Sequence, residues 1–240
     1  MIPTLQLGQV GRTGVAADPF FSSVSLLLHG EGSDGGTTIT DSSSFAKTCT
    51  AVNEATTRTA QFKFGSASML IATATNNSMI SVPNDSTLDV ASSDFTIEMW
   101  ARFTTVPSVI NILCLKATGT GVYPFRLIRS AFGNLQFQNF NSASSLVNDI
   151  TGTTILAANT WYFLQARRKL GDTFAIAVNG VQENFNNTSS HTLFSSSAVL
   201  SIGNFSSAAT FPMIGNIDEF RFTKGVARAF ALPTHPFYNP

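Results

Sequence analysis

The sequence predicts an all-β domain, a two-sheet antiparallel sandwich of the jelly-roll type. Charged residues make up only 12% of the chain, Phe occurs 21 times, and Ser, Thr and Asn are frequent, which is typical of strands and turns. Strand-like stretches recur about every 8 to 12 residues between Gly, Asn, Asp or Ser, and no long window has helical apolar spacing. About 12 to 14 strands fit two stacked sheets of about six or seven, and 240 residues fit one main domain.

Taken in order, the first strand is expected in SVSLLLHG (23–30). MLIATATNNSMISVP (69–83) is interpreted as two strands separated by a turn at Asn76 and Asn77, because Asn accepts left-handed backbone angles. DFTIEMWARF (94–103) places Phe95, Ile97 and Met99 on one face, expected to be core, and leaves a mixed opposite face that includes Trp100. Asn179-Gly180 predicts a two-residue hairpin turn. Further strands are expected in INILCLK (110–116), YPFRLIR (123–129), NLQFQNF (134–140), WYFLQARR (161–168) and TFAIAVNGVQENF (173–185).

Charge and hydropathy exclude several classes of partner. The formal net charge is zero and the longest basic run is Arg167 to Lys169, so nucleic acid is not an expected partner. The first residues lack the basic and apolar regions of a signal peptide, and no window approaches the roughly 18 apolar residues of a membrane span. We expect a protein that is made in a cytoplasm, is not secreted and has no membrane partner. Cys49 and Cys114 are expected to be unpaired thiols.

Residues 1–22 differ from the rest and are predicted to form an extended N-terminal arm that precedes a jelly-roll domain at 23–240. Glycines alternate there with apolar residues and charge is almost absent. One interpretation is a frayed chain end. The other is an anchor, in which Ile2, Leu5, Leu7 and Val10 bind a partner by strand addition.

An anchor of this kind would bind weakly as a single copy. Burial of four side chains contributes about 1.5 to 3 kcal/mol each, whereas ordering of about ten residues costs roughly 1 to 2 kcal/mol each. Firm attachment therefore predicts several arms acting together, and hence a homo-oligomer.

Five segments, in the correct order, resemble the concanavalin A-like jelly-roll superfamily, and within it the laminin-G-like domains related to pentraxins. The resemblance covers nearly all of residues 24–240 and implies the same sandwich. Its carriers are LLLHGEGSDGGTTITDSSSF (26–45), KFGSASMLI (63–71), DFTIEMWARF (94–103), TWYFLQARRKLGDTFAIAVNG (160–180) and IGNIDEFRFTKGVAR (214–228).

The adjacent carboxylates Asp218 and Glu219 raise the question of acid/base chemistry. Neighbours on a strand point to opposite faces unless a bulge intervenes. Ile217 and Phe220 are three residues apart whereas Phe220 and Phe222 are two apart, so a bulge here would bring all three apolar side chains into one core. We predict a structural role for the two carboxylates, with Arg221 or nearby backbone as partners. Glucanases of the resembled superfamily carry an E-x-D-x-E strand. In this chain Glu98 is the only acid of its strand between Phe95 and Phe103, and Trp100 stands two residues further on, where a second carboxylate would be required. We therefore predict a protein that is not an enzyme and has no catalytic residues.

The resemblance also raises the question of a calcium site, because laminin-G-like and pentraxin domains often hold this ion at the rim of the sandwich. Asn76 and Asn77 fall where the first pair of pentraxin ligands lies, but the second loop, GNFSSAAT (203–210), has no carboxylate. Calcium prefers several carboxylates. No metal site and no cofactor are therefore predicted, although calcium stays open, with Asp41 or Asp85 as additional ligands.

Sugar binding is a further candidate chemistry. It needs a shallow groove, an aromatic platform and amide or hydroxyl partners, and the candidate ligand-binding residues are Trp100, Tyr123, Tyr162, Asn76 and Asn77. The alternative for each aromatic side chain is that it covers a sheet or fills the core.

Jelly rolls preceded by a short, uncharged, Gly-rich segment resemble virion proteins of tailed bacteriophages. This implies a non-enzymatic virion protein: a capsid decoration protein, a head fibre or a tail-associated adhesin. Its partners would be other virion proteins, through the arm, and host-surface glycans. Two alternatives remain, a soluble carbohydrate-binding module and a diverged glycosidase.

Overall fold

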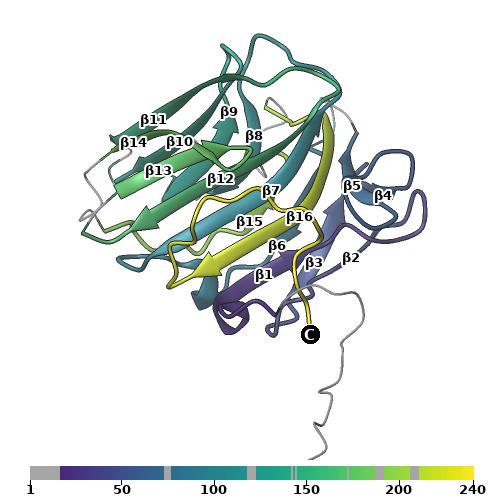
Figure 1. Cartoon of the computed structure of the whole chain (residues 1–240), viewed down its shortest axis with the longest axis horizontal. Helices are drawn as coiled ribbons and strands as arrows, with labels where there is room; N and C mark the ends of the chain where they lie inside the picture. The colour runs from purple at the N-terminus through teal and green to yellow at the C-terminus, as the bar shows by residue number, and fades with distance from the viewer. Residues whose placement is uncertain are drawn as a thin grey trace, which may run out of the picture.

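The computed structural model is an all-β sandwich, as predicted (Figure 1). It describes residues 17–72, 77–117, 123–141, 143, 145–171, 173–186, 192–205 and 211–240. These residues form sixteen strands and two single-turn 3-10 helices, η1 (Phe21–Ser23) and η2 (Ser86–Leu88). The described residues contain no α-helix. The strand count exceeds the predicted 12 to 14 because three strands have only three residues each. Three residues are too few to show an alternation of apolar and polar side chains.

Each sheet has eight strands, and all pairs of named strands run antiparallel. Sheet A runs in the order β14 (Val181–Asn186), β13 (Thr173–Val178), β12 (Trp161–Lys169), β7 (Phe95–Phe103), β16 (Gly215–Lys224), β5 (Ser68–Ile71) and β4 (Thr56–Arg58), with β1 (Val24–Leu28) also paired to β16. Sheet B runs β11 (Leu146–Ile155), β10 (Asn134–Phe140), β9 (Phe125–Arg129), β8 (Asn111–Lys116), β15 (Leu200–Ile202), β6 (Met79–Val82), β3 (Thr48–Val52) and β2 (Thr38–Thr40).

The main hydrophobic core lies between the two sheets, as the alternation of β7 predicts. Phe95, Ile97 and Met99 are fully buried in it. The Phe95 ring stacks on Phe222 of β16, with centroids 6.3 Å apart and planes 9° apart. Residues of odd number on β7 thus face the core, and Glu98 and Trp100 face outward from sheet A.

The predicted hairpin at Asn179-Gly180 is confirmed. Both residues have positive φ, 51° and 78°, as a type I′ turn requires, and they join β13 to β14. The Asn77 backbone is also left-handed, with φ 47°, but β5 and β6 on either side of that connection belong to different sheets. The connection therefore crosses the sandwich and does not make a hairpin.

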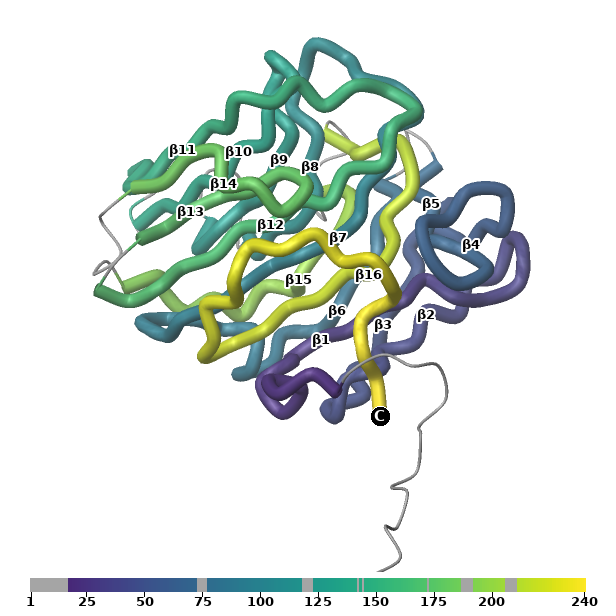
Figure 2. Tube along the Cα trace, in the orientation of Figure 1, coloured from purple at the N-terminus to yellow at the C-terminus, as the bar shows by residue number. Residues whose placement is uncertain are grey.

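The C-terminal segment turns back after β16 and runs over the outer face of sheet A (Figures 1 and 2). The Arg228 N–H donates to Thr96 Oγ1 of β7 at 2.9 Å, and Arg167 of β12 donates to the Arg228 carbonyl at 2.8 Å. Further along, the Phe237 ring lies edge-on to Phe163 of β12. This segment and the residues next to it bury much of the outer face of sheet A.

The proposed arm lies almost wholly outside the described residues, and so do Ile2, Leu5, Leu7 and Val10. The described residues of the predicted arm begin at Ala17. Asp18 forms ion pairs with Arg221 and Arg228, so the chain already contacts the sandwich at residue 18. The arm and its boundary at residue 22 remain predictions.

Candidate functional site

A β-bulge sits at the paired carboxylates Asp218 and Glu219. The register of β16 against β7 shifts between Asp218 and Arg221, and Glu219 has φ 52°. Ile217, Phe220 and Phe222 consequently all reach the core, as predicted. The bulge turns both carboxylates away from the core, where they contact two segments that lie outside sheet A.

Each carboxylate holds one of these segments through backbone N–H groups. Asp218 Oδ2 accepts from Lys63 at 2.6 Å and from Phe64 at 3.1 Å. Glu219 Oε2 accepts from Phe237 at 2.7 Å, and its Oε1 lies 2.8 Å from His29 Nδ1. The predicted backbone partners are therefore confirmed, whereas Arg221 pairs with Glu98 and Asp18.

Burial dominates the protonation of Asp218. It raises the pKa of this carboxyl to about 7, against the backbone N–H groups of Phe64 and Lys63, and the charge of Glu219 adds to the rise. Burial alone would lower the pKa of His29, but the hydrogen bond and charge of Glu219 raise it above its usual value. These shifts follow from the structural contacts and need no bound substrate.

The three predicted aromatic residues lie on three different parts of the sandwich. Trp100 is only 3% exposed, on the outer face of sheet A, where Phe64 and Phe163 cover it and Lys63 Nζ lies 4.1 Å from its ring. Tyr162 packs against the main core, and its hydroxyl accepts from the Ala157 N–H at 3.1 Å. Tyr123, 7% exposed, belongs to an apolar cluster on the outer face of sheet B. They do not form one aromatic platform.

The carboxylates suggested as extra calcium ligands already have protein partners. Asp41 accepts the N–H groups of Leu27, Ser43 and Lys47. Asp85 caps η2 and pairs with Lys47. Among the described ranges no three His, Cys, Asp or Glu side chains group as metal ligands. Asn77 is half-buried and Asn76 lies outside the described residues, so their ligand role remains a prediction.

A row of polar side chains crosses the outer face of sheet B, and we call it the polar row. Its strands place its members side by side, since Gln138 is directly opposite Arg126 of β9 and Asp149 of β11, and Gln136 is opposite Thr151. Because Leu135 and Phe137 of β10 face the core, the glutamines between them face outward. The polar row consists of Arg126, Gln136, Gln138, Asp149 and Thr151.

Hydrogen bonds join the members of the polar row into one chain. Arg126 Nε donates to Gln138 Oε1 at 2.6 Å, and Gln138 Nε2 donates to Asp149 Oδ2 at 3.0 Å. Gln136 Nε2 donates to Asp149 Oδ1 at 2.6 Å and to Thr151 Oγ1 at 3.0 Å. These bonds orient planar amide, guanidinium and carboxylate groups that have more donors and acceptors than the row itself uses.

Aromatic rings flank the polar row at Arg126. The guanidinium carbon lies 4.9 Å from the Tyr123 ring centroid and 5.4 Å from that of Phe140, and the two rings meet edge to face at 5.2 Å. Sequence reasoning found Tyr123 but not its polar neighbours. The alternation in NLQFQNF signals that Gln136 and Gln138 share a face, whereas their strand partners depend on the register.

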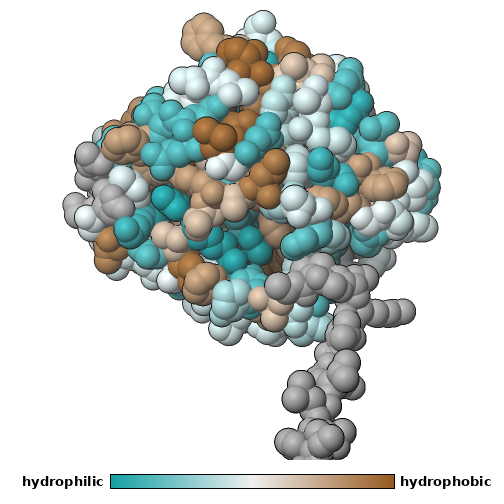
Figure 3. Space-filling model, in the orientation of Figure 1, coloured by the Kyte–Doolittle hydropathy of each residue, from teal (hydrophilic) through white to brown (hydrophobic). Residues whose placement is uncertain are grey.

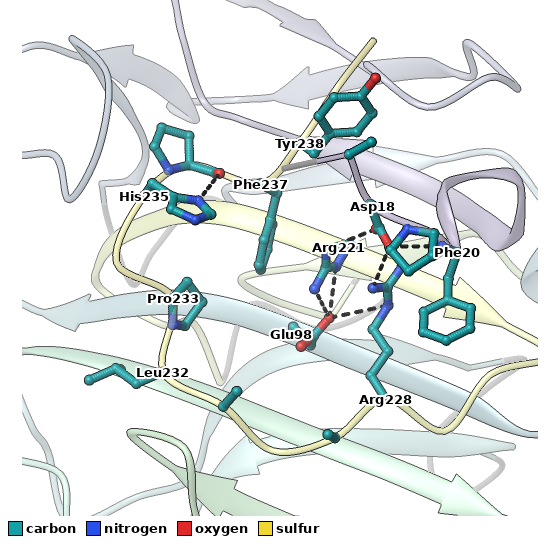
Figure 4. A pocket seen from close by; sticks show the side chains of 15 residues that line it. Asp18, Phe20, Glu98, Arg221, Arg228, Leu232, Pro233, His235, Phe237 and Tyr238 are labelled. Atoms are coloured by element: carbon teal, nitrogen blue, oxygen red, sulfur yellow. Dashed lines mark hydrogen bonds and ion pairs between the residues drawn. The ribbon is translucent and has the colours of Figure 1, made fainter. Parts of the chain in front are cut away.

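Glu98, the acid on β7, belongs to a network of charges under the C-terminal segment (Figure 4). Its Oε2 lies 2.6 Å from Arg221 Nη2, and its Oε1 accepts from Gln165 Nε2 at 2.9 Å. Asp18 pairs with Arg221 and Arg228. Burial alone would raise the pKa of Asp18, but the hydrogen bond from Arg228, the Phe20 N–H and the arginine charges lower it below its usual value.

Hydrophobic and hydrophilic residues are mixed on the described part of the outer face of sheet A. Figure 3 shows hydrophobic residues scattered among hydrophilic ones on the face that carries the C-terminal segment. This is the normal pattern of a solvated surface. None of the helices in the described part of the chain is long and apolar enough to cross a membrane.

Comparisons with known proteins agree with this architecture. Residues 74–229 match the family model of the concanavalin A-like lectin/glucanases superfamily. A search of curated protein sequences found no match.

Among solved structures, the binding domain of Paraclostridial Mosquitocidal Protein 1 superposes with a TM-score of 0.68 at 12% identity, over 87% of this chain and 50% of that one. The binding domain of Botulinum neurotoxin DC, solved in complex with rat synaptotagmin II, gives 0.67 at 14% identity, over 87% and 50%. The binding domain of botulinum neurotoxin serotype D gives 0.66 at 10%, over 88% and 50%. The chain thus matches about half the length of each solved chain, and the likeness establishes the fold.

Proposed function

Because the chain belongs to the concanavalin A-like lectin/glucanase superfamily, we propose that it is a non-enzymatic virion protein whose jelly-roll domain binds glycans on a host surface. The observation that carries the glycan-binding part is the polar row. Sugar hydroxyl groups are recognised by planar amide, carboxylate and guanidinium groups held in fixed positions, beside an aromatic ring. The polar row supplies the first three, and Tyr123 and Phe140 supply the last.

A binding role is favoured over hydrolysis by the state of the carboxylates. A glycosidase needs one carboxyl group with a raised pKa, as the acid, opposite a second that is free to act as nucleophile or base. Glu98 and Asp18 are instead paired with arginines, and Asp18 has a lowered pKa. Asp218 has a raised pKa, but its Oδ2 is occupied by two backbone N–H groups.

The superposed toxin domains support the same class of function. They are named as binding domains, and one was solved with a protein partner, rat synaptotagmin II. At 12% and 14% identity only the architecture is shared. We carry over the idea that this sandwich presents a recognition surface, and we assign that surface to the polar row on grounds of its own chemistry.

Replacing Arg126 with alanine is expected to weaken oligosaccharide binding at least tenfold, about 1.4 kcal/mol. The change removes the donors that link Gln138 to the aromatic flank, and hydrogen bonds made by charged groups are among the stronger ones. Binding is measured on a panel of immobilised neutral and acidic oligosaccharides. Gln182→Ala, an exposed glutamine on β14 of the other sheet, is the matched control and should bind as the unmodified chain does. Failure of the unmodified chain to bind any sugar, or an unchanged Arg126→Ala variant, would refute the glycan assignment.

Attachment to the virion is proposed to depend on the N-terminal residues. Deleting residues 1–16 is expected to abolish incorporation into particles, since four apolar side chains available for burial are lost. The double change of Leu5 and Leu7 to Ser should act in the same direction, whereas Gln6→Ala and Gln9→Ala serve as controls. Immunoblots of purified particles measure the result. Normal incorporation of the deleted chain would mean that the jelly roll itself makes the attachment.

A further inference from the structure

A pocket of about 330 Å³ opens on the outer face of sheet A, between the two terminal segments of the described chain. Figure 4 shows its floor, where Glu98 and Arg221 project from β7 and β16, beside Arg228 and Asp18. On the opposite side the C-terminal segment lines the pocket with Leu232, Pro233, His235, Phe237 and Tyr238. A charged floor with apolar and aromatic walls is typical of a small-molecule site, and the volume is near the lower end of the usual range.

The two arginines bind the Asp18 side chain with the geometry that proteins use to bind the carboxylate of a ligand. Arg228 Nη1 donates to Asp18 Oδ1 at 3.0 Å and Nη2 donates to Oδ2 at 2.7 Å, a two-pronged contact. Arg221 Nη1 adds a third contact to Oδ2, at 3.3 Å. The Phe237 ring lies 3.7 Å from the Arg221 guanidinium carbon and fixes its plane. This arrangement would recognise any carboxylate that reached the same position.

The network is neutral only while Asp18 is in place. The charges of two arginines and two carboxylates balance. The sandwich fixes both arginines, since Arg221 lies on β16 and Arg228 Nε donates to Thr223 Oγ1 of the same strand at 2.8 Å. Asp18 alone among the four comes from a segment that precedes the first strand. If that segment moves away, Glu98 is the only carboxylate of the network left to both arginines, 2.6 Å from Arg221 Nη2 and 3.8 Å from Arg228 Nε. One buried positive charge is then uncompensated, at a high energetic cost.

We propose that Arg221 and Arg228 form a binding site for a small molecule that carries a carboxylate, such as an acidic monosaccharide, and that Asp18 occupies this site as an internal competitor. The ligand carboxylate takes the position of the Asp18 side chain and the rest of the ligand enters the pocket. Ligand binding and the contact of Asp18 with the sandwich therefore exclude each other. The polar row plays no part in this site, which belongs to the other sheet.

The test compares the full chain with its Asp18→Ala variant, using sodium glucuronate, sodium acetate and glucose as probes. Asp18→Ala is expected to bind glucuronate at least tenfold more tightly than the unmodified chain does, because the competitor is gone and an unpaired charge is left. Its melting temperature should rise with glucuronate, since a ligand stabilises the state that binds it, and should not rise with glucose at equal ionic strength. Asp18→Ser, which keeps a small polar side chain without charge, is a second variant in case Asp18→Ala does not fold.

Two controls separate the site from general charge effects. Asp34→Ala removes another aspartate that pairs with an arginine, Arg58, at the surface, and should behave as the unmodified chain does. Arg228→Gln combined with Asp18→Ala should abolish the gain in affinity for glucuronate. Equal gains for acetate and glucuronate support recognition of the carboxylate alone, and a larger gain for glucuronate supports contacts with the sugar ring as well. The proposal would be overturned if neither Asp18 variant bound glucuronate more tightly than the unmodified chain does, or if the tighter binding survived Arg228→Gln. It would also be overturned if glucose raised the melting temperature as much as glucuronate does.

Discussion

Replacing Glu98 with alanine is expected to destabilise the domain by about 3 to 5 kcal/mol, the usual result of breaking a buried ion pair. Glu98 is buried, and its Oε2 accepts from Arg221 Nε at 2.7 Å. Without it, Arg221 and Arg228 share Asp18 as their only carboxylate within this network. The loss includes the hydrogen bond from Gln165.

Urea-induced unfolding followed by circular dichroism measures this change in the free energy of unfolding. Asp34→Ala is the matched control, because its ion pair with Arg58 is exposed on both sides, and its expected loss is at most about 1 kcal/mol. If Glu98→Ala lost no more than this control, the network would contribute little and Glu98 would be available for another role.

Replacing Asp218 with asparagine is expected to stabilise the domain above pH 7, by up to about 4 kcal/mol. Burial raises the pKa of this carboxyl from 3.8 to about 7, so the folded protein holds the proton more tightly than the unfolded chain does. The stability linked to this proton is fully present below the unfolded pKa and is lost as the pH rises through the folded pKa. The asparagine oxygen keeps the bonds to Lys63 and Phe64 and never ionises.

The measurement is the difference in stability between Asp218→Asn and the unmodified chain at several pH values. It should be near zero at about pH 3, increase between about pH 4 and pH 7, and then level off. His29 also has a raised pKa, so the stability that its proton contributes is likewise lost as the pH rises. Both proteins contain His29, and subtracting their stabilities at each pH therefore reduces this contribution. Asp34→Asn, at an exposed site, should give no such curve. A difference that did not change with pH would contradict the raised pKa of Asp218.

Local patterns predicted the sandwich well, because each depends on a few neighbouring residues. Alternation on β7 identified Phe95, Ile97 and Met99 as core residues, and Asn179-Gly180 identified a turn from its backbone angles. The bulge at Glu219 was expected because Ile217 and Phe220 are three residues apart and both apolar. In all three cases the physical cause lies within a single segment of the chain.

The candidate sites depend on contacts that no segment contains. Asp18 and Arg228 are 210 positions apart, and His29 and Glu219 are 190 apart. The polar row depends on the register of β9, β10 and β11, which sequence alternation leaves open. The proposed aromatic platform illustrates the same limit, since Trp100, Tyr123 and Tyr162 are suitable side chains that the fold distributes over different faces.

The most direct test of the glycan-binding proposal is an NMR titration of the isotope-labelled full chain with the oligosaccharide that binds best on the panel. We expect changes in chemical shift that concentrate on the outer face of β9, β10 and β11, at Arg126, Gln136, Gln138 and Asp149, and that require at least ten times more oligosaccharide in Arg126→Ala. Shifts confined to the terminal pocket of sheet A, or no shifts with any oligosaccharide, would contradict the assignment of the polar row as the glycan-binding surface.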